Sequence, residues 1–194
     1  MPILLYNLTW MIFNCLLAVI PILFGYFFLA TNNIFYKLLS GFLWLIFLPN
    51  TIYIFTDLIH IFEQWDKVAS YDRPLLLLQY ILLEAIGLSS FIMAMKPFEK
   101  FINGLKLKKN NRVWIVILFN FLIAFGMVLG RVQRVNSWDI FLSYEKVSTS
   151  IVQAVTTPQY VGLIVLFGLF CNFFYFLFKD SLYRATVKMM RIFT

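Results

Sequence analysis

Charged side chains are scarce in this chain. Asp, Glu, Lys and Arg make up 13% of its 194 residues, and hydrophobic residues make up 62%. Soluble domains carry about 25% charged and about 45–50% apolar residues. A soluble domain of this size exposes much of its surface to water and has no core large enough for the excess. The composition therefore excludes an ordinary soluble domain and predicts a protein that lies in a lipid bilayer.

Cysteine and the common catalytic motifs are also lacking. The two cysteines, Cys15 and Cys171, lie in apolar runs without CxxC or Cys/His spacing. We expect buried free thiols rather than a disulfide or a metal site. No P-loop, GxSxG, HExxH or GxGxxG motif occurs. The chain thus offers no recognised nucleotide or dinucleotide site, and we expect no cofactor.

Long apolar runs dominate what is present. About 20 apolar residues, each rising about 1.5 Å, cross a hydrocarbon core of about 30 Å. Five segments are long enough, namely residues 3–30, 38–57, 74–95, 113–130 and 158–178. There is no repeat of fixed period and no low-complexity linker. We predict one all-α domain over residues 1–194, a polytopic transmembrane bundle of five spans, with a polar surface connection at residues 143–157.

The first two apolar runs have unusual lengths. No Lys or Arg precedes the first run, which far exceeds the roughly 7–15 apolar residues of a signal peptide, so we expect it to remain as a span. The run at residues 34–62 is too long for one plain helix, and Pro49 within it lacks a backbone N–H. It is either one kinked span that projects beyond the membrane, or a span that breaks between Pro49 and Asn50 and continues as an interfacial or re-entrant helix.

The basic residues are distributed unevenly between the two sides of a five-span bundle. Eleven fall on one side, at Lys37, in the loop at 96–112 and in the tail (Lys179, Arg184, Lys188 and Arg191). Five fall on the other side, at Lys67, Arg73, Arg131, Arg134 and Lys146. Cytoplasmic loops carry the excess of Lys and Arg, so we predict an external N-terminus and a cytoplasmic C-terminus. The net charge of +7 is thus a topology signal, and no nucleic acid is expected as a partner.

A stripe of polar residues follows Pro49. Asn50, Tyr53, Asp57, His60 and Gln64 recur at steps of 3, 4, 3 and 4, which places them on one side of a helix. Because polar side chains are costly in lipid, the stripe should face the bundle interior or a wet cavity near the outer surface. The alternative is an amphipathic interfacial helix whose polar face lies in water.

Glu84 is an acidic residue midway along the third predicted span. It lies eleven residues from Arg73, about 16 Å deep at about 1.5 Å per residue. Asn120 lies eleven residues before Arg131, so it should have a similar depth and is a candidate partner. The functional hypothesis is a proton-accepting or ligand-coordinating acid. The alternative is an interhelical hydrogen bond that holds the bundle together.

Two arginines stand at the end of the fourth predicted span, in the sequence GRVQRVNSWD. Arg131 and Arg134 are three residues apart and should share a helix face. Guanidinium groups fit the planar geometry of carboxylates and phosphates. Their candidate partners are Asp57, Asp139, an anionic lipid headgroup or another anionic substrate.

Two sequence blocks resemble a known family. LPN-x-x-Y-x-x-TDLIH at residues 48–60 and GR-x-x-R-x-NSWD at residues 130–139 are similar to the uncharacterised bacterial membrane family catalogued as domain of unknown function 1361. The resemblance covers most of the chain. It implies a bacterial plasma-membrane protein of the cell envelope and brings no established activity. It also implies that the family signature includes Asn50, Asp57, His60, Arg131, Arg134, Asn136 and Asp139.

A metal site is an open alternative. Asp57 and His60, with Glu63 or Asp66, offer ligands within ten residues. Zinc sites usually use several His or Cys, and His60 is the one histidine of the chain. An oxygen-rich Mg²⁺ or Ca²⁺ site stays open, but we expect no metal.

Three functions compete, and whether the protein is an enzyme stays open. In the first, Arg131 and Arg134 hold an anionic group, such as that of a lipid or envelope precursor, at the outer membrane–water boundary. His60, oriented by Asp57, acts there as general base or acid. The remaining ligand-binding residues of this site are Asn50, Tyr53, Glu84, Asn136 and Asp139. The second function is an accessory or regulatory subunit whose partner is another membrane protein. The third is a small transporter or channel that uses Glu84.

Overall fold

The computed structural model describes residues 2–190, and these residues form helices and short connections with no β-strand. Five helical runs are long and apolar enough to cross a membrane. They are Ile3–Ala30, Ile34–Gln64, Ser70–Gly104, Lys109–Val132 and Pro158–Ala185. The prediction of an all-α bundle with five spans is confirmed. Arg191, which was counted in the basic tail, lies outside the described residues.

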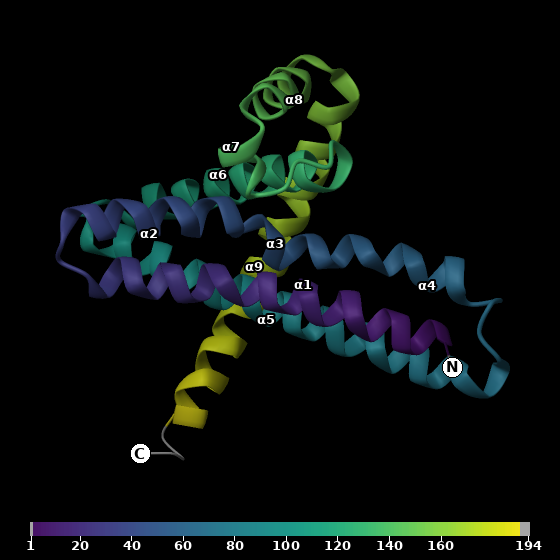
Figure 1. The fold of residues 1–194 in the computed structure, drawn as a ribbon. Helices are drawn as coiled ribbons and strands as arrows, with labels where there is room; N and C mark the ends of the chain where they lie inside the picture. The colour runs from purple at the N-terminus through teal and green to yellow at the C-terminus, as the bar shows by residue number, and fades with distance from the viewer. Residues whose placement is uncertain (1, 191–194) are drawn as a thin grey trace.

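The long helices pack side by side in two groups (Figure 1). The helices α1 (Pro2–Ala30) and α5 (Arg73–Gly104) lie against each other, and the second span, which begins with α2 (Ile34–Phe47), runs along α1. The helix α6 (Lys109–Met127) packs on α9 (Pro158–Met190), which crosses the first group and carries the C-terminus away from it.

The second span is one kinked run of helix and does not turn back. After α2 it continues through α3 (Pro49–Tyr53), the 3₁₀ segment η1 (Ile54–Leu58) and α4 (Ile59–Gln64). Leu48, between α2 and α3, keeps helical dihedral angles of φ −57° and ψ −40°. Pro49 removes one backbone donor without reversing the chain. Of the two alternatives drawn from the sequence, the structure adopts the kinked span.

The fourth span ends in a π-helical turn. The segment η3 (Val128–Val132) follows α6 directly, and the chain then turns at Arg134, whose φ is +54°. Only glycine adopts this left-handed region at little cost, so the position of Arg134 marks a sharp end to the helix. Arg131 and Arg134 therefore do not share one helix face, contrary to the prediction.

The polar connection predicted at residues 143–157 is not a loop, because most of it is helical. A short helix α7 (Asp139–Leu142) leads into α8 (Tyr144–Thr156), which packs against α9. Ser150 and Ala154, one turn apart, are buried in that contact. The polar composition hid the signal, which is the spacing of Val147, Ser150, Ile151 and Ala154 at three and four residues along one helix face.

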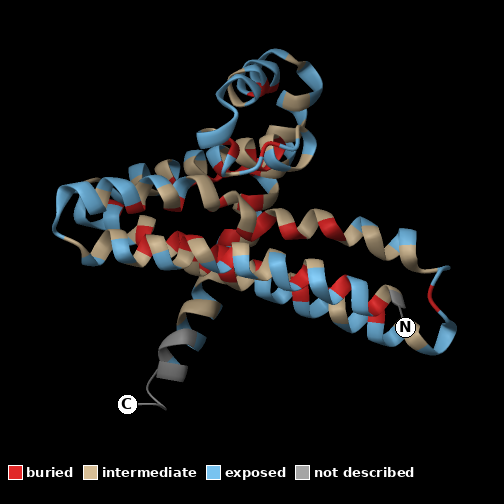
Figure 2. Ribbon diagram, viewed as in Figure 1, coloured by how far each residue is buried: buried red, intermediate tan, exposed pale blue. Residues whose placement is uncertain are grey.

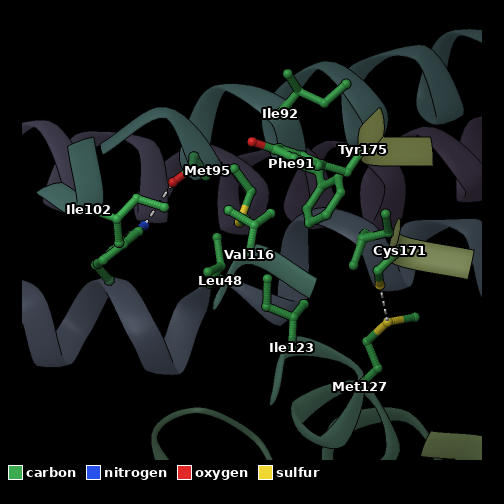
Figure 3. Close-up of a cluster of buried hydrophobic side chains, with 13 residues drawn as sticks. Leu48, Phe91, Ile92, Met95, Ile102, Val116, Ile123, Met127, Cys171 and Tyr175 are labelled. Atoms are coloured by element: carbon green, nitrogen blue, oxygen red, sulfur yellow. Dashed lines mark hydrogen bonds between the residues drawn. The ribbon is translucent and has the colours of Figure 1, made fainter. Parts of the chain in front are cut away.

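The main apolar core joins four of the spanning helices. Figure 3 shows Phe91 and Met95 of α5, Ile123 of α6 and Tyr175 of α9 packed together, and all four are buried. Cys171 in the same core is a free thiol whose Sγ lies 3.8 Å from Met127 Sδ. The other cysteine, Cys15, is also free, but it is only half-buried, whereas a buried thiol was expected.

The outer faces of the long helices are apolar. Figure 2 shows much of their surface as exposed, and the exposed side chains include Leu16, Leu23 and Leu118, each more than 60% exposed. Exposed apolar surface of this extent is unfavourable in water and suits contact with lipid tails. The fold is therefore that of an integral membrane protein.

Candidate functional site

The site is centred on Asp57, a buried carboxylate in the 3₁₀ segment η1. Its Oδ1 atom lies 2.8 Å from Nη2 of Arg131, which extends from the π-helical end of α6. Its Oδ2 atom accepts a hydrogen bond of 3.1 Å from the side-chain amide of Asn14 on α1. A buried charge needs a partner of opposite charge and further hydrogen bonds, and two segments distant in sequence supply them here.

His60 lies beside this ion pair and contacts Arg131 directly. Nη2 of Arg131 lies 3.3 Å from His60 Nε2, and His60 Nδ1 lies 2.8 Å from Oε2 of Glu63. A guanidinium only donates hydrogen bonds, so the contact assigns Nε2 as acceptor and places the proton on Nδ1, which donates to Glu63. The imidazole is 34% exposed, and its acceptor nitrogen faces the arginine.

The partner that orients His60 differs from the prediction. His60 Nε2 is 4.0 Å from Asp57 Oδ1, which is longer than a hydrogen bond. Glu63, on the next turn, holds the ring instead. From the sequence, Glu63 was a candidate only as a metal ligand, although its spacing of three residues from His60 is the usual signal for contact on a helix.

The polar stripe of the second span faces other helices and not open water. Tyr53 donates a hydrogen bond of 3.4 Å to Oδ1 of Asn14, and Gln64 exchanges hydrogen bonds of 2.7 and 3.1 Å with Asn7. Asn7 and Asn14 lie seven residues apart on α1, which places them on one helix face. Sequence reasoning missed both, and this heptad spacing within an apolar run was the available signal.

Arg131 joins the cluster around Asp57, whereas the end of the second signature block, from Asn136 to Asp139, stabilises a turn. The Asp139 carboxylate accepts hydrogen bonds from the backbone N–H of Asn136 at 2.9 Å and from Lys146 Nζ at 2.6 Å. Lys146 also donates to the backbone carbonyl of Arg134. The hydrogen bond from Lys146 is the main cause that holds the pKa of Asp139 below its usual range, and the Asn136 backbone N–H acts in the same direction.

Asn50 links the two blocks. Its side-chain amide donates a hydrogen bond of 3.2 Å to Ser137 Oγ, which in turn donates to the carbonyl of Ile46 at 2.9 Å. The turn after η3 is thereby tied to the second span next to the Pro49 kink. Arg134 itself is exposed, and within residues 2–190 its guanidinium forms no ion pair.

Glu84 and Asn120 do not form the expected pair. The Asn120 side chain donates to Asn172 Oδ1 at 3.0 Å and so joins α6 to α9. Both carboxyl oxygens of Glu84 are buried without a hydrogen-bond partner among the described residues, and so is the hydroxyl of Tyr80 one turn away. The structure thus separates Glu84 from the hydrogen-bonded cluster.

A cavity of about 480 Å³ adjoins the cluster. Asn14 and Tyr53, which connect to Asp57, form part of its wall, and so does Asn50. The rest of the wall is mainly apolar and comes from α1, α2, α3, α6, η3 and the α7–α8 segment. No sequence pattern predicted this cavity, because it depends on how six segments meet.

Metal ligation has little support in the geometry. Within residues 2–190, no group of three or more His, Cys, Asp and Glu side chains is placed to hold a metal ion. Arg131 occupies the position beside Asp57 and His60 that a cation would take.

The fold and the site define the class of the molecule, an integral membrane protein with five apolar helices and a buried ion-pair network. The chain belongs to the family described as protein of unknown function, DUF1361, whose family model matches residues 13–174. The matched region contains both signature blocks, so the family inferred from them is confirmed. No curated protein and no solved structure matches the chain.

Proposed function

We propose that this protein binds an anionic amphiphile at the cluster of Asp57, His60, Glu63 and Arg131, in the outer half of a bacterial plasma membrane. The observation that carries the proposal is a continuous chain of polar contacts. It runs from the partly exposed His60 through Arg131 and Asp57 to Asn14 on the cavity wall. Such a chain joins the surface of the bundle to a ligand-sized space.

Arg131 supplies the anion-binding group. Its Nη2 atom contacts Asp57 and His60, while its Nε and Nη1 atoms make no hydrogen bond within residues 2–190. The side chain is 33% exposed, so these donors are accessible to a phosphate or carboxylate. The exposed Arg134 adds a second positive charge beyond the end of the same span.

His60 supplies acid–base chemistry. An imidazole with an acceptor Nε2 is a candidate general base, and Glu63 fixes its orientation. The external location rests on the eleven-to-five division of Lys and Arg between the two sides. Asp57 lies seven residues inside the end of α4 at Gln64, roughly 10 Å along the helix.

Lipid binding by purified protein in detergent tests the proposal. Native mass spectrometry would compare phosphatidylglycerol with phosphatidylcholine for the wild type, Arg131→Lys and Arg134→Ala. Arg131→Lys keeps the charge beside Asp57 and removes the fork. A charge-assisted hydrogen bond is worth about 1.5–3 kcal/mol, so we expect Arg131→Lys to weaken phosphatidylglycerol binding about tenfold or more. Arg134→Ala should weaken it less, and phosphatidylcholine binding should not change.

The matched control for Arg134→Ala is Arg184→Ala. Arg184 is exposed on α9, on the side of the membrane that we predict to be cytoplasmic, so this variant should bind lipid like the wild type. Inorganic phosphate as a competitor distinguishes a free anion from a lipid headgroup. In cells, His60→Ala should alter the lipid and envelope profile. Equal binding of the two lipids, together with wild-type binding by both arginine variants, would overturn the proposal.

A further inference from the structure

The cavity beside the cluster has an uneven distribution of polarity. Of its lining residues, those with polar side-chain groups are Asn14, Asn50, Tyr53, Asn136 and Ser137, apart from the indole of Trp138. The remainder are Leu, Ile, Val, Phe, Pro and Gly. The amide of Asn14 is already engaged with Asp57, and that of Asn50 with Ser137. The polar groups therefore belong to the ion-pair network and its link to the turn, while the rest of the space is apolar.

The mouth of the cavity opens towards lipid. Phe13 of α1, Leu45 of α2 and Leu122 of α6 line the cavity and are 52%, 42% and 54% exposed. All three lie within the membrane-spanning runs Ile3–Ala30, Ile34–Gln64 and Lys109–Val132. A molecule that enters between these side chains comes from the hydrocarbon phase and not from water.

The far side of the cavity is covered by the segment that the sequence failed to predict. Val147 and Ile151 of α8 line the wall, and Lys146, which precedes Val147, ties α8 to Asp139 and to the carbonyl of Arg134. The amphipathic helix α8 thus places apolar side chains over a space that lies beyond the end of α6 and would otherwise be open.

We propose that this cavity holds one acyl chain of a membrane lipid that enters laterally between α1, α2 and α6. The inference rests on the proposed function for the headgroup, which binds at Arg131, and it assigns the ligand as a lipid in place of a water-soluble anion. A volume of about 480 Å³ lies within the about 300–1,000 Å³ of ligand sites. The mainly apolar wall takes the chain, and Asn14 and Tyr53 at its polar side lie next to the ester region.

A glycine on the cavity wall allows the space to be filled. Gly130 lines the cavity, and a Cβ added there would meet only the carbonyl oxygen of Val135 at 3.7 Å, an ordinary contact. Gly130→Leu should therefore keep the fold and extend into the space of the chain. Gly162→Leu is the matched control, because a Cβ at Gly162 meets nothing within 4 Å. Gly126 is unsuitable, since a Cβ there would clash with Pro49 Cγ.

Native mass spectrometry of the detergent-purified protein with added phosphatidylglycerol is the first measurement. We expect one retained lipid per chain for the wild type and Gly162→Leu, and at least about tenfold lower occupancy for Gly130→Leu, equal to about 1.4 kcal/mol. Gly130→Ala should fall between them. Circular dichroism and thermal unfolding check that each variant is folded.

A second measurement uses the wild type and does not depend on any variant. Phosphatidylglycerol with a diazirine in one acyl chain is photolysed in the complex, and the labelled peptides are mapped. We expect labels on the segments that carry Leu122 and Ile151, which line the cavity from α6 and α8. Labels confined to outward-facing positions such as Leu16 and Leu23 would overturn the inference.

The two proposals fail in different ways. If Gly130→Leu lowers the binding of phosphatidylglycerol and phosphatidylcholine alike and Arg131→Lys lowers neither, the chain site stands and the anionic headgroup site fails. If Arg131→Lys lowers phosphatidylglycerol binding and Gly130→Leu leaves it unchanged, the headgroup site stands and the acyl-chain inference is overturned.

Discussion

Asp57 and Glu84 are acidic residues within neighbouring spans, and their surroundings differ sharply. Asp57 has an ion pair with Arg131 and a hydrogen bond from Asn14. Glu84 has two buried oxygens and no hydrogen-bond partner within the described part of the chain. Asp57 lies where the helix is irregular, in a 3₁₀ segment opposite a π-helical end, whereas Glu84 lies in the regular helix α5.

The comparison shows how a charge is accommodated inside a helical bundle. A regular helix satisfies its own backbone and presents few groups to a neighbouring side chain. In an irregular segment, a side chain such as that of Arg131 leaves the face that it would share on a regular helix and points towards other elements. A break in helical geometry beside an acidic residue therefore indicates a site more strongly than the presence of the acidic residue in a span does.

Removing the partner of Asp57 should have the largest effect, because it makes Asp57 resemble Glu84. Arg131→Ala leaves a buried carboxylate without its counter-charge, and we expect a loss of about 3 kcal/mol in the free energy of unfolding, at the lower end of the range for buried pairs because Arg131 is partly exposed. Steric trapping in bicelles measures it. The double variant Arg131→Ala with Asp57→Asn should regain part of the loss, and a double variant as unstable as the single one would contradict the role of the pair.

Removing the neutral partner should have a smaller effect. Asn14→Ala deletes the amide that donates to Asp57 and accepts from Tyr53. We expect a loss of about 1–2 kcal/mol, between the values for hydrogen bonds to charged groups and those for hydrogen bonds in membrane bundles. The same unfolding measurement applies. Asn14→Asp places two acids together and should be worse than alanine; the reverse order would show that the amide does not act as a donor to Asp57.

Neutralising Glu84 should change little and in the opposite direction. Glu84→Gln removes a group whose charged form is costly to bury without a partner, so stability should stay within about 1 kcal/mol of the wild type or rise. Lipid occupancy should also stay at the wild-type level. A marked loss of stability or binding would show that Glu84 has a charged partner in the functional protein, and would favour the transporter hypothesis.

The smallest effect concerns the carboxylate of Asp139, which lies outside the membrane-spanning runs. Lys146 and the Asn136 backbone hold the pKa of Asp139 below its usual value, which is about 3.9. A lowered folded pKa means that the contribution to stability is present above the unfolded pKa and is lost as the pH falls through the folded one. Hydrogen exchange of the α7–α8 segment should therefore increase below about pH 4. The Asp139→Asn variant should exchange faster at neutral pH and should show no further increase in exchange below about pH 4. The same increase in this variant would show that another group causes it.

The sequence predicted the helical spans well because their signal is local. The length and composition of an apolar run such as Ile3–Ala30 predict a membrane span without any information about the rest of the fold. The polar stripe from Asn50 to Gln64 was visible for the same reason. The partners of that stripe were harder to predict. Asn14 was overlooked as one polar residue in an apolar run, and Glu63 was assigned to a different role.

The errors have a common physical cause. Arg134 was placed on the face of Arg131 by extending a regular helix, but the π-helical turn and the positive φ at Arg134 end that helix. Asn120 was paired with Glu84 by depth alone, yet depth does not fix the rotation of a helix about its axis. In the structure Asn120 faces α9 and bonds to Asn172.

By itself, the sequence determined that the protein is a helical bundle of five membrane spans, because twenty or so apolar residues have no other stable environment. It also determined which residues are polar within those spans. Only the tertiary structure decided that Arg131 meets Asp57 and His60, that Asp139 instead closes a turn with Lys146, and that a mainly apolar cavity lies beside them. These outcomes depend on helix rotation, on the kink at Pro49 and on the end of α6, which are set by packing between segments distant in the chain.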